Sequence, residues 1–159
     1  MNAVDNFQNR IESFIKAADK NHVKMIMVGG GAVNFHGYQR HSADIDFWID
    51  ITTVNLKNIL QTLIDLGYNL NDLPDKVKTG QQNISIKISP VFEIELITSF
   101  NPGCSFKEAY EQSIAVDKGG LKYNVLSLDH LIQSKITSER LKDKLDVEML
   151  QKIQLKRKE

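Results

Sequence analysis

Apolar residues recur at helical spacing in several segments of the chain, and caps or glycines bound these segments. Over residues 5–21 the recurrence begins after Asp5, which we expect to be the N-cap. A second helix is expected from Thr53, as N-cap, to Leu66, and Gly67 ends it. The remaining helices are expected at residues 31–38, 105–112 and 127–155, with a break near Arg140.

Short apolar or alternating runs predict the strands of one mixed sheet. Residues 23–28 form an apolar run that stops at a glycine, and residues 43–50 alternate between apolar and polar side chains. Residues 84–96 predict a hairpin around Ser89-Pro90, and a smaller hairpin turns at residues 117–120. We therefore expect an α+β fold with about five strands. It forms a single domain over residues 1–159, with a core at about 23–126 and C-terminal helices at about 127–155.

Composition adds few constraints to this picture. The 159 residues are 42% apolar and 25% charged, which is typical of a soluble globular domain. The 20 basic and 20 acidic side chains cancel, so no overall field attracts nucleic acid or a membrane. The single cysteine, Cys104, suits a reducing compartment, and residues 1–5 lack the basic start of a signal peptide. We therefore expect a cytoplasmic protein with no membrane partner, and interpret Cys104 as a small loop residue.

Two motifs carry candidate chemistry. Asp44 and Asp46 lie two positions apart on a predicted strand, so their carboxylates share one face and suit the oxygen preference of Mg²⁺. Alone, this pattern is more typical of a solvated strand face. The run Gly29-Gly30-Gly31 precedes it, between a strand and a helix start, where bare backbone N–H groups can approach a phosphate. The alternative is a tight turn, but the two motifs in this order favour a magnesium-nucleotide site. The run matches neither the Gly-x-Gly-x-x-Gly nor the Walker pattern.

A third carboxylate is available further along the chain. Glu93 and Glu95 share one face of a later predicted strand. If that strand lies beside residues 43–50, one of them can complete a metal cluster. The alternative is an exposed strand face. This alternative weighs as much as function for Glu93, whereas we favour a functional role for Glu95.

At this point the chain resembles a known family. The segments Val28-Gly-Gly-Gly-Ala32, His36-Gly-Tyr-Gln-Arg40 and Asp44-Ile-Asp46 are similar to the minimal nucleotidyltransferases of the DNA-polymerase-β superfamily. Within it, the resemblance is closest to the abortive-infection-type toxin nucleotidyltransferases. Further similarity over residues 95–109 and 127–146 extends the resemblance to about residues 23–150.

The resemblance implies a nucleotidyltransferase fold and a set of roles. Asp44, Asp46 and Glu95 would be catalytic residues and ligands of one or two Mg²⁺ ions, and Gly29 and Gly30 would hold the phosphates of a nucleoside triphosphate (NTP). The protein would move a nucleoside monophosphate to a hydroxyl of RNA, protein or a small molecule. Relatives often carry aspartate at the position of Glu95, so metal binding is better supported than turnover. The alternative is a weak or inactive enzyme that acts as a nucleotide sensor or toxin–antitoxin partner.

Basic and packed residues complete the hypothesis. Arg40 is expected to neutralise phosphate or to form a surface salt bridge, and Lys135, which matches a family lysine, is expected to bind the triphosphate. The stripe of Arg140, Lys142, Asp143 and Asp146 is interpreted mainly as a solvated helix face, with Arg140 and Asp143 equally compatible with function. His36 and Trp48 are expected to pack in the core, and residues 69–82 to form a loop or a lid.

Overall fold

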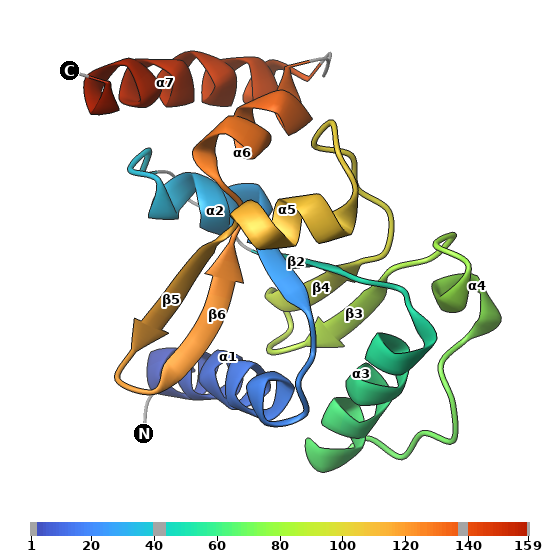
Figure 1. Ribbon diagram of the computed structural model, residues 1–159. Coiled ribbons are helices and arrows are strands. Elements are labelled where there is room, and N and C mark those ends of the chain that lie inside the picture. The colour runs from blue at the N-terminus through green and yellow to red at the C-terminus, as the bar shows by residue number, and fades with distance from the viewer. Residues whose placement is uncertain (1–2, 40–43, 137–139, 159) are drawn as a thin grey trace.

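The computed structural model describes residues 3–39, 44–136 and 140–158, which form one mixed sheet of six strands with helices on both faces (Figure 1). The α+β expectation is confirmed, and the expected number of strands is one too low. The strands are β1 (Met25–Val28), β2 (Ile45–Ile49), β3 (Ile84–Lys87), β4 (Glu93–Ile97), β5 (Ile114–Lys118) and β6 (Leu121–Val125). The helices are α1 (Ala3–Lys20), α2 (Gly29–Phe35), α3 (Thr53–Asp65), α4 (Asp75–Lys78), α5 (Phe106–Gln112), α6 (Leu128–Lys135) and α7 (Leu141–Arg157).

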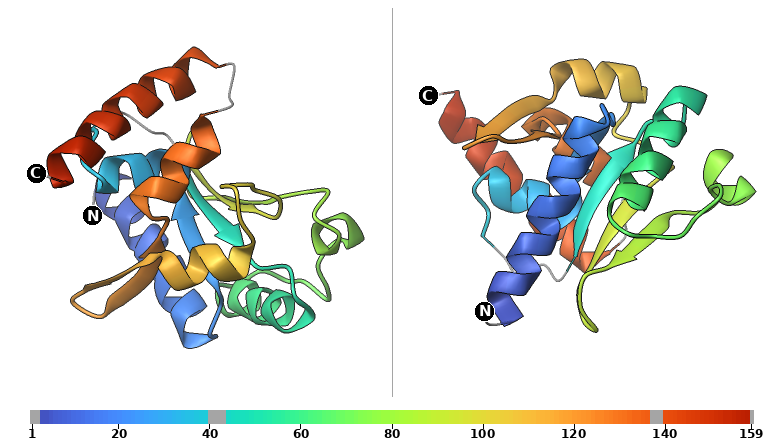
Figure 2. Two further views of the ribbon diagram at one scale, coloured as in Figure 1. Left: turned by 45° about the horizontal axis from the view of Figure 1, so that its top comes forward. Right: turned by 90° about the horizontal axis from the view of Figure 1, so that it is seen from below.

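The strand order is β3-β4-β2-β1-β6-β5, so β2 lies inside the sheet between β1 and β4. Strand β2 runs antiparallel to β1 and parallel to β4. Both expected hairpins, β3–β4 and β5–β6, are confirmed as antiparallel pairs. The second hairpin joins the sheet through a short parallel contact, in which Met27 of β1 faces Val125 of β6. It projects from the body of the molecule (Figure 2).

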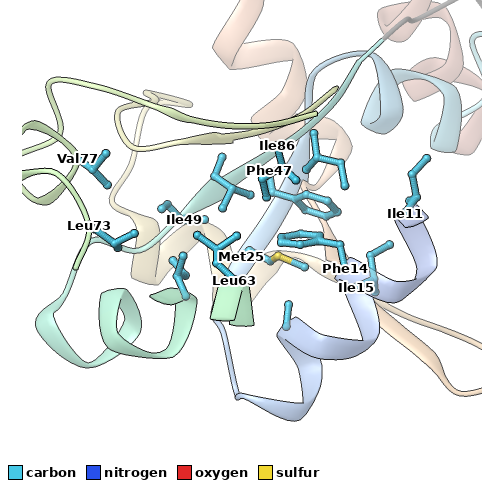
Figure 3. Close-up of a cluster of buried hydrophobic side chains, with 14 of the residues drawn as sticks. Ile11, Phe14, Ile15, Met25, Phe47, Ile49, Leu63, Leu73, Val77 and Ile86 are labelled. Atoms are coloured by element: carbon cyan, nitrogen blue, oxygen red, sulfur yellow. The ribbon is translucent and has the colours of Figure 1, made fainter. Parts of the chain in front are cut away.

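One face of the sheet is covered by α1 and α3 and forms the larger apolar core (Figure 3). The alternation of β2 directs Phe47 and Ile49 to this face, where both are buried. Phe14 of α1 packs against Phe47 with ring centroids 6.0 Å apart. Helix α3 adds Leu56, Ile59 and Leu63.

The opposite face of the sheet is covered by α2, α5, α6 and α7, with α7 outermost beside α6 (Figure 2). The other side chains of β2, Asp46 and Trp48, point to this face. Trp48 packs against Phe100 and Phe106 with ring centroids 5.3 and 5.0 Å away, which confirms its expected role in packing. A second apolar core forms here, so both faces of β2 are covered.

Several helix boundaries differ from those expected. Helix α1 begins at Ala3, so Asp5 lies within the helix and is not its N-cap. The cap of α3 is Thr52, one residue before Thr53, because the Thr52 hydroxyl accepts the N–H of Asn55. Helix α2 begins at the first glycine of the run rather than at the third. Ser105 and Ser127 are the N-caps of α5 and α6, because each hydroxyl accepts a hydrogen bond from the backbone N–H three residues later.

The segment 69–82 was expected to be a loop or a lid, and it contains the one-turn helix α4. Leu73 and Val77 from this segment are buried in the core beneath β2 (Figure 3). Its end is also fixed, because the Thr98 hydroxyl donates to the Gln82 carbonyl over 3.0 Å. These contacts favour a packed element of the fold over a lid.

Only some of the apolar side chains of α7 pack inward. Leu141 and Leu145 are 71% and 47% exposed, whereas Leu150 is fully buried. The face of α7 that packs inward instead begins with two aspartates, Asp143 and Asp146. No described helix is both long enough and apolar enough to cross a membrane.

A buried amide ties the ends of β1, β2 and α3 together. The side chain of Asn55 accepts the Lys24 N–H over 2.7 Å and donates to the carbonyls of Lys24 and Asp50 over 3.0 and 2.6 Å. Asn55 is 3% exposed, so its amide forms these hydrogen bonds away from water. It therefore stabilises the edge at which both central strands meet α3.

We expect Asn55→Ala to lower the free energy of unfolding by about 2–3 kcal/mol, because it removes three hydrogen bonds made by a buried side chain. Urea denaturation followed by circular dichroism measures this loss. Gln61→Ala on the same helix is the matched control, since the Gln61 amide bonds only at the surface, and its loss should stay below about 0.5 kcal/mol. Equal losses in the two variants would contradict the assigned role of Asn55.

Candidate functional site

A glycine turn and a carboxylate meet where β1 ends. Val28 of β1 pairs with Asp46 of β2, and Gly29 then starts α2 with a positive φ of 62°. A Cβ atom on Gly29 would lie 2.5 Å from Asp46 Oδ2. The bare backbone of Gly29 therefore lies directly against the carboxylate, and only glycine fits both the dihedral and the space.

The second carboxylate comes from the neighbouring strand. In the parallel β2–β4 pair, Asp46 stands opposite Glu95 in register. Side chains that are opposite in register share one face of a sheet, so these two carboxylates project to the same side. Asp44 precedes β2 by one residue and lies two positions before Asp46. The condition set for the later glutamate strand is thus met, because β4 pairs with β2.

The charges of these residues act on Asp46. The pKa of Asp46 is raised from 3.8 to about 6, first by burial and then by the negative charges of Glu95 and Asp44. The positive charges of Lys142 and Lys135 act in the opposite direction. Asp44, Asp46 and Glu95 therefore form an acidic cluster, faced by two lysines from the C-terminal helical region.

The chemistry of this acidic cluster suits a hard divalent cation. Like charges disfavour ionisation of Asp46, and a cation between the carboxylates relieves that repulsion. Among the described residues, no three histidine, cysteine or acidic side chains stand close enough to form a finished metal site. Mg²⁺ does not require one, because it commonly binds through one or two carboxylates and completes its octahedron with water and phosphate.

The two glutamates of β4 have different partners. Glu93 Oε1 lies 3.7 Å from Lys87 Nζ on the adjacent β3, which is a surface ion pair across the hairpin. Glu95 Oε1 accepts a hydrogen bond of 3.2 Å from Asn83 Nδ2. The sequence reasoning did not single out Asn83, because its contact depends on the register of β3 against β4.

Lys135 lies at the end of α6 in a buried ionic cluster. It is 8% exposed, and its Nζ lies 3.0 Å from Asp143 Oδ1 and 3.1 Å from Asp146 Oδ2. Arg140 completes the cluster with a contact of 2.8 Å to Asp143 Oδ2. Asp143 and Asp146 are 3% and 1% exposed, so the solvated-face interpretation is wrong for Asp146 and is ruled out as one of the two alternatives for Asp143. Their buried charges are compensated by a lysine on another helix, which helical spacing does not reveal.

The remaining candidates for phosphate binding are Gly30, which the structure describes, and Arg40. Gly30 is buried in the first turn of α2, next to Gly29. Gly31 of α2 lies close to the preceding strand β1, since a Cβ on Gly31 would lie 2.9 Å from Met27 Sδ. Arg40 lies outside the described residues.

His36 serves the packing rather than the acidic cluster. His36 is 2% exposed, as expected of a packed histidine, and its Nε2 lies 2.7 Å from the Leu126 carbonyl. Burial lowers the pKa of His36, although the bond to the Leu126 carbonyl partly opposes this, and Arg157 of α7 lowers it further. A neutral imidazole accordingly joins α2 to β6 and α7.

Cys104 contacts a histidine that is distant in sequence. Its Sγ lies 3.5 Å from His130 Nε2 of α6. Burial, and then the charge of Glu108, raise the pKa of the Cys104 thiol. A raised pKa disfavours the thiolate, so this contact is not that of an activated nucleophile.

The close approach of Gly29 to Asp46 predicts an asymmetric response to alanine. Gly119 has nearly the same φ, 59°, but no atom within 4 Å of an added Cβ, and is the matched control. Gly119→Ala should cost only the left-handed backbone penalty, about 1–2 kcal/mol of unfolding free energy. Gly29→Ala should cost about 1–3 kcal/mol more, because the carboxylate or the turn must move. Urea denaturation of both variants tests this, and equal losses would show that the turn does not press on Asp46.

Comparison with known proteins agrees with this geometry. No curated protein matches the chain. The family model described as "Nucleotidyltransferase of unknown function (DUF6036)" matches residues 5–155, which include every described element of the acidic cluster and of the ionic cluster around Lys135. The closeness to abortive-infection-type toxins is not confirmed by this match. The chain belongs to this family of nucleotidyltransferases of unknown function.

Proposed function

We propose that this protein is a magnesium-dependent nucleotidyltransferase that moves a nucleoside monophosphate from an NTP to an acceptor hydroxyl. The observation that carries the proposal is the register of Asp46 with Glu95 beside the bare backbone of Gly29. It combines carboxylates for a cation with a turn that a phosphate can approach. The family match supports the transferase class, and the acceptor class remains RNA, protein or a small molecule.

The carboxylates have distinct tasks in this proposal. Asp44 and Asp46 would hold Mg²⁺, and Glu95 would act as a ligand and accept the proton of the acceptor hydroxyl. When bound, Mg²⁺ neutralises phosphate charge and lowers the pKa of the attacking hydroxyl. Gly29 and Gly30 would bring backbone N–H groups toward the phosphates at the start of α2.

The basic residues would balance the triphosphate. Lys135 is held by Asp143 and Asp146, and its charge already reaches Asp46. An ammonium group has three N–H donors, so Lys135 can keep its two aspartates and still donate to a phosphate oxygen. Arg40 would contribute a second positive charge.

The reaction itself is a substitution at phosphorus. The acceptor oxygen forms a bond to the α-phosphorus, and the bond from that phosphorus to the bridging oxygen breaks. Pyrophosphate leaves with the electron pair, and the hydroxyl proton passes to the Glu95 carboxylate. The alternative is a nucleotide sensor or toxin–antitoxin partner on the same fold, which would bind nucleotide without these steps. The glutamate at position 95, where relatives often carry aspartate, is the feature that favours this alternative.

Incubation of the folded protein with Mg²⁺ and NTPs labelled at the α-phosphate tests the proposal. RNA, proteins and hydroxylated small molecules serve as acceptors, and transfer is measured as label in the acceptor together with released pyrophosphate. Asp46→Asn and Glu95→Gln should each lower the rate by about 100-fold or more. Glu111→Gln, at an exposed acid of α5, is the control and should retain the rate. Nucleotide binding without transfer would favour the sensor, and absence of both would contradict the proposal.

The raised pKa of Asp46 predicts that the site opposes folding when no metal is bound. The folded protein holds the Asp46 proton more tightly than the unfolded chain does, so this cost is absent below about pH 4 and is complete above about pH 6. With EDTA present at pH 7.5, Asp46→Asn should therefore be more stable than the wild type by about 1–2 kcal/mol, after allowance for solvent screening.

Urea denaturation at pH 7.5 and pH 4 measures this difference, which should vanish at the lower pH. Glu111→Gln should show no comparable gain at either pH. A wild type at least as stable as Asp46→Asn at pH 7.5 would contradict the cost that burial and the neighbouring carboxylates impose on ionised Asp46.

A further inference from the structure

Asn83 connects the third carboxylate to the frame of the sheet. It directly precedes β3, and its Nδ2 donates to Glu95 Oε1 over 3.2 Å. Its Oδ1 accepts the backbone N–H of Thr98 over 3.0 Å and lies 3.4 Å from the Thr98 hydroxyl. One amide therefore bonds to Glu95 with its donor end and to Thr98, just after β4, with its acceptor end.

The contacts to Thr98 decide which way the amide points. A backbone N–H can only donate, so the atom that faces it must be the oxygen of Asn83. The amino group is thereby directed to Glu95. Thr98 is itself fixed, because it is 5% exposed and its hydroxyl donates to the Gln82 carbonyl over 3.0 Å. The donor of Asn83 is consequently held by a buried residue, although Asn83 itself is exposed.

The register of the hairpin explains why residue 83, rather than a nearer one, makes this contact. Ser85 is the residue of β3 directly opposite Glu95. Asn83 lies two positions before Ser85, so it faces Glu95 on the diagonal of the same face. A longer amide side chain spans this diagonal, whereas the short serine side chain beside it has no donor of comparable reach.

We infer that Asn83 is a positioning residue for Glu95 in the proposed metal site. It binds Oε1 and leaves Oε2 as the oxygen that serves the cation or the acceptor proton. This inference rests on the proposed function. It assigns a role to Asn83, a residue outside the acidic cluster. A glutamate has one more rotatable bond than an aspartate, and an outer partner that restrains it makes it as defined a ligand as the shorter acid.

A double-mutant cycle on metal affinity tests the inference. Mn²⁺ binding is measured by electron paramagnetic resonance for the wild type, Asn83→Ala, Glu95→Ala and the double variant. Asn83→Ala should raise the dissociation constant about tenfold, as the loss of an outer partner does at other metal sites. In the Glu95→Ala background, the same change should have no further effect, because Asn83 acts only through Glu95.

Ser85→Ala is the matched control, since it alters the residue directly opposite Glu95 without touching the amide, and it should bind Mn²⁺ as the wild type does. Additive effects of Asn83→Ala and Glu95→Ala would overturn the inference and leave the proposed function intact. They would mean that Asn83 supports the fold through Thr98 instead. A folded wild type that binds no Mn²⁺ would contradict the metal site of the proposed function and, with it, this inference.

A second measurement uses no metal and does not depend on whether the Asn83→Ala variant folds. The side-chain amide of Asn83 in the wild type gives a pair of proton–nitrogen NMR signals. These should shift when Glu95 is changed to alanine, because their hydrogen-bond acceptor is removed. Signals that stay in place would show that the contact is absent in solution, and would overturn the inference whatever the outcome of the metal titration.

Discussion

The two-sided burial of β2 is the constraint on which the structure depends. A strand inside a sheet directs alternate side chains to opposite faces, and both faces of this sheet are covered by helices. Phe47 and Ile49 fill one core, while Trp48 packs in the other. Asp46 is the polar exception on that second face, and it is accommodated only because the glycine turn beside it contributes no side chain. Core packing thus fixes where the acidic cluster must lie.

The acidic cluster and the ionic cluster around Lys135 differ in how their charges are compensated. Lys135, Arg140, Asp143 and Asp146 balance one another, so their burial is compensated locally. Asp46 is treated differently, because burial and the charges of Glu95 and Asp44 raise its pKa, and the charges of Lys142 and Lys135 only partly oppose this. Such imbalance is typical of functional sites, where stability is given up for an interaction with a ligand.

Local patterns were sufficient to predict most of the fold, but only part of the site. Alternation along residues 43–50 correctly predicted the strand that carries Asp46, because the period of a strand is a property of the strand itself. The pairing of Asp46 with Glu95 depends on β4 lying beside β2. The sequence pattern does not determine this order of strands, so the pairing could be stated only as a condition. The burial of Asp143 and Asp146 was missed for a related reason, since their compensating lysine belongs to another helix. Asn83 was missed because its role follows from a diagonal of the β3–β4 register.

The contacts that build the site join residues that are far apart along the chain. Asp46 meets Glu95 across the β2–β4 pair, and Arg157 of α7 reaches His36 of α2 across 121 positions. Closing such long loops costs chain entropy before any contact is gained, so structures of this kind form slowly and as a whole. Shorter fragments of the chain therefore contain the residues of the site but not the site itself. During synthesis the carboxylates come together only after β4 has been made, and the buried partner of Lys135 arrives with the last helix.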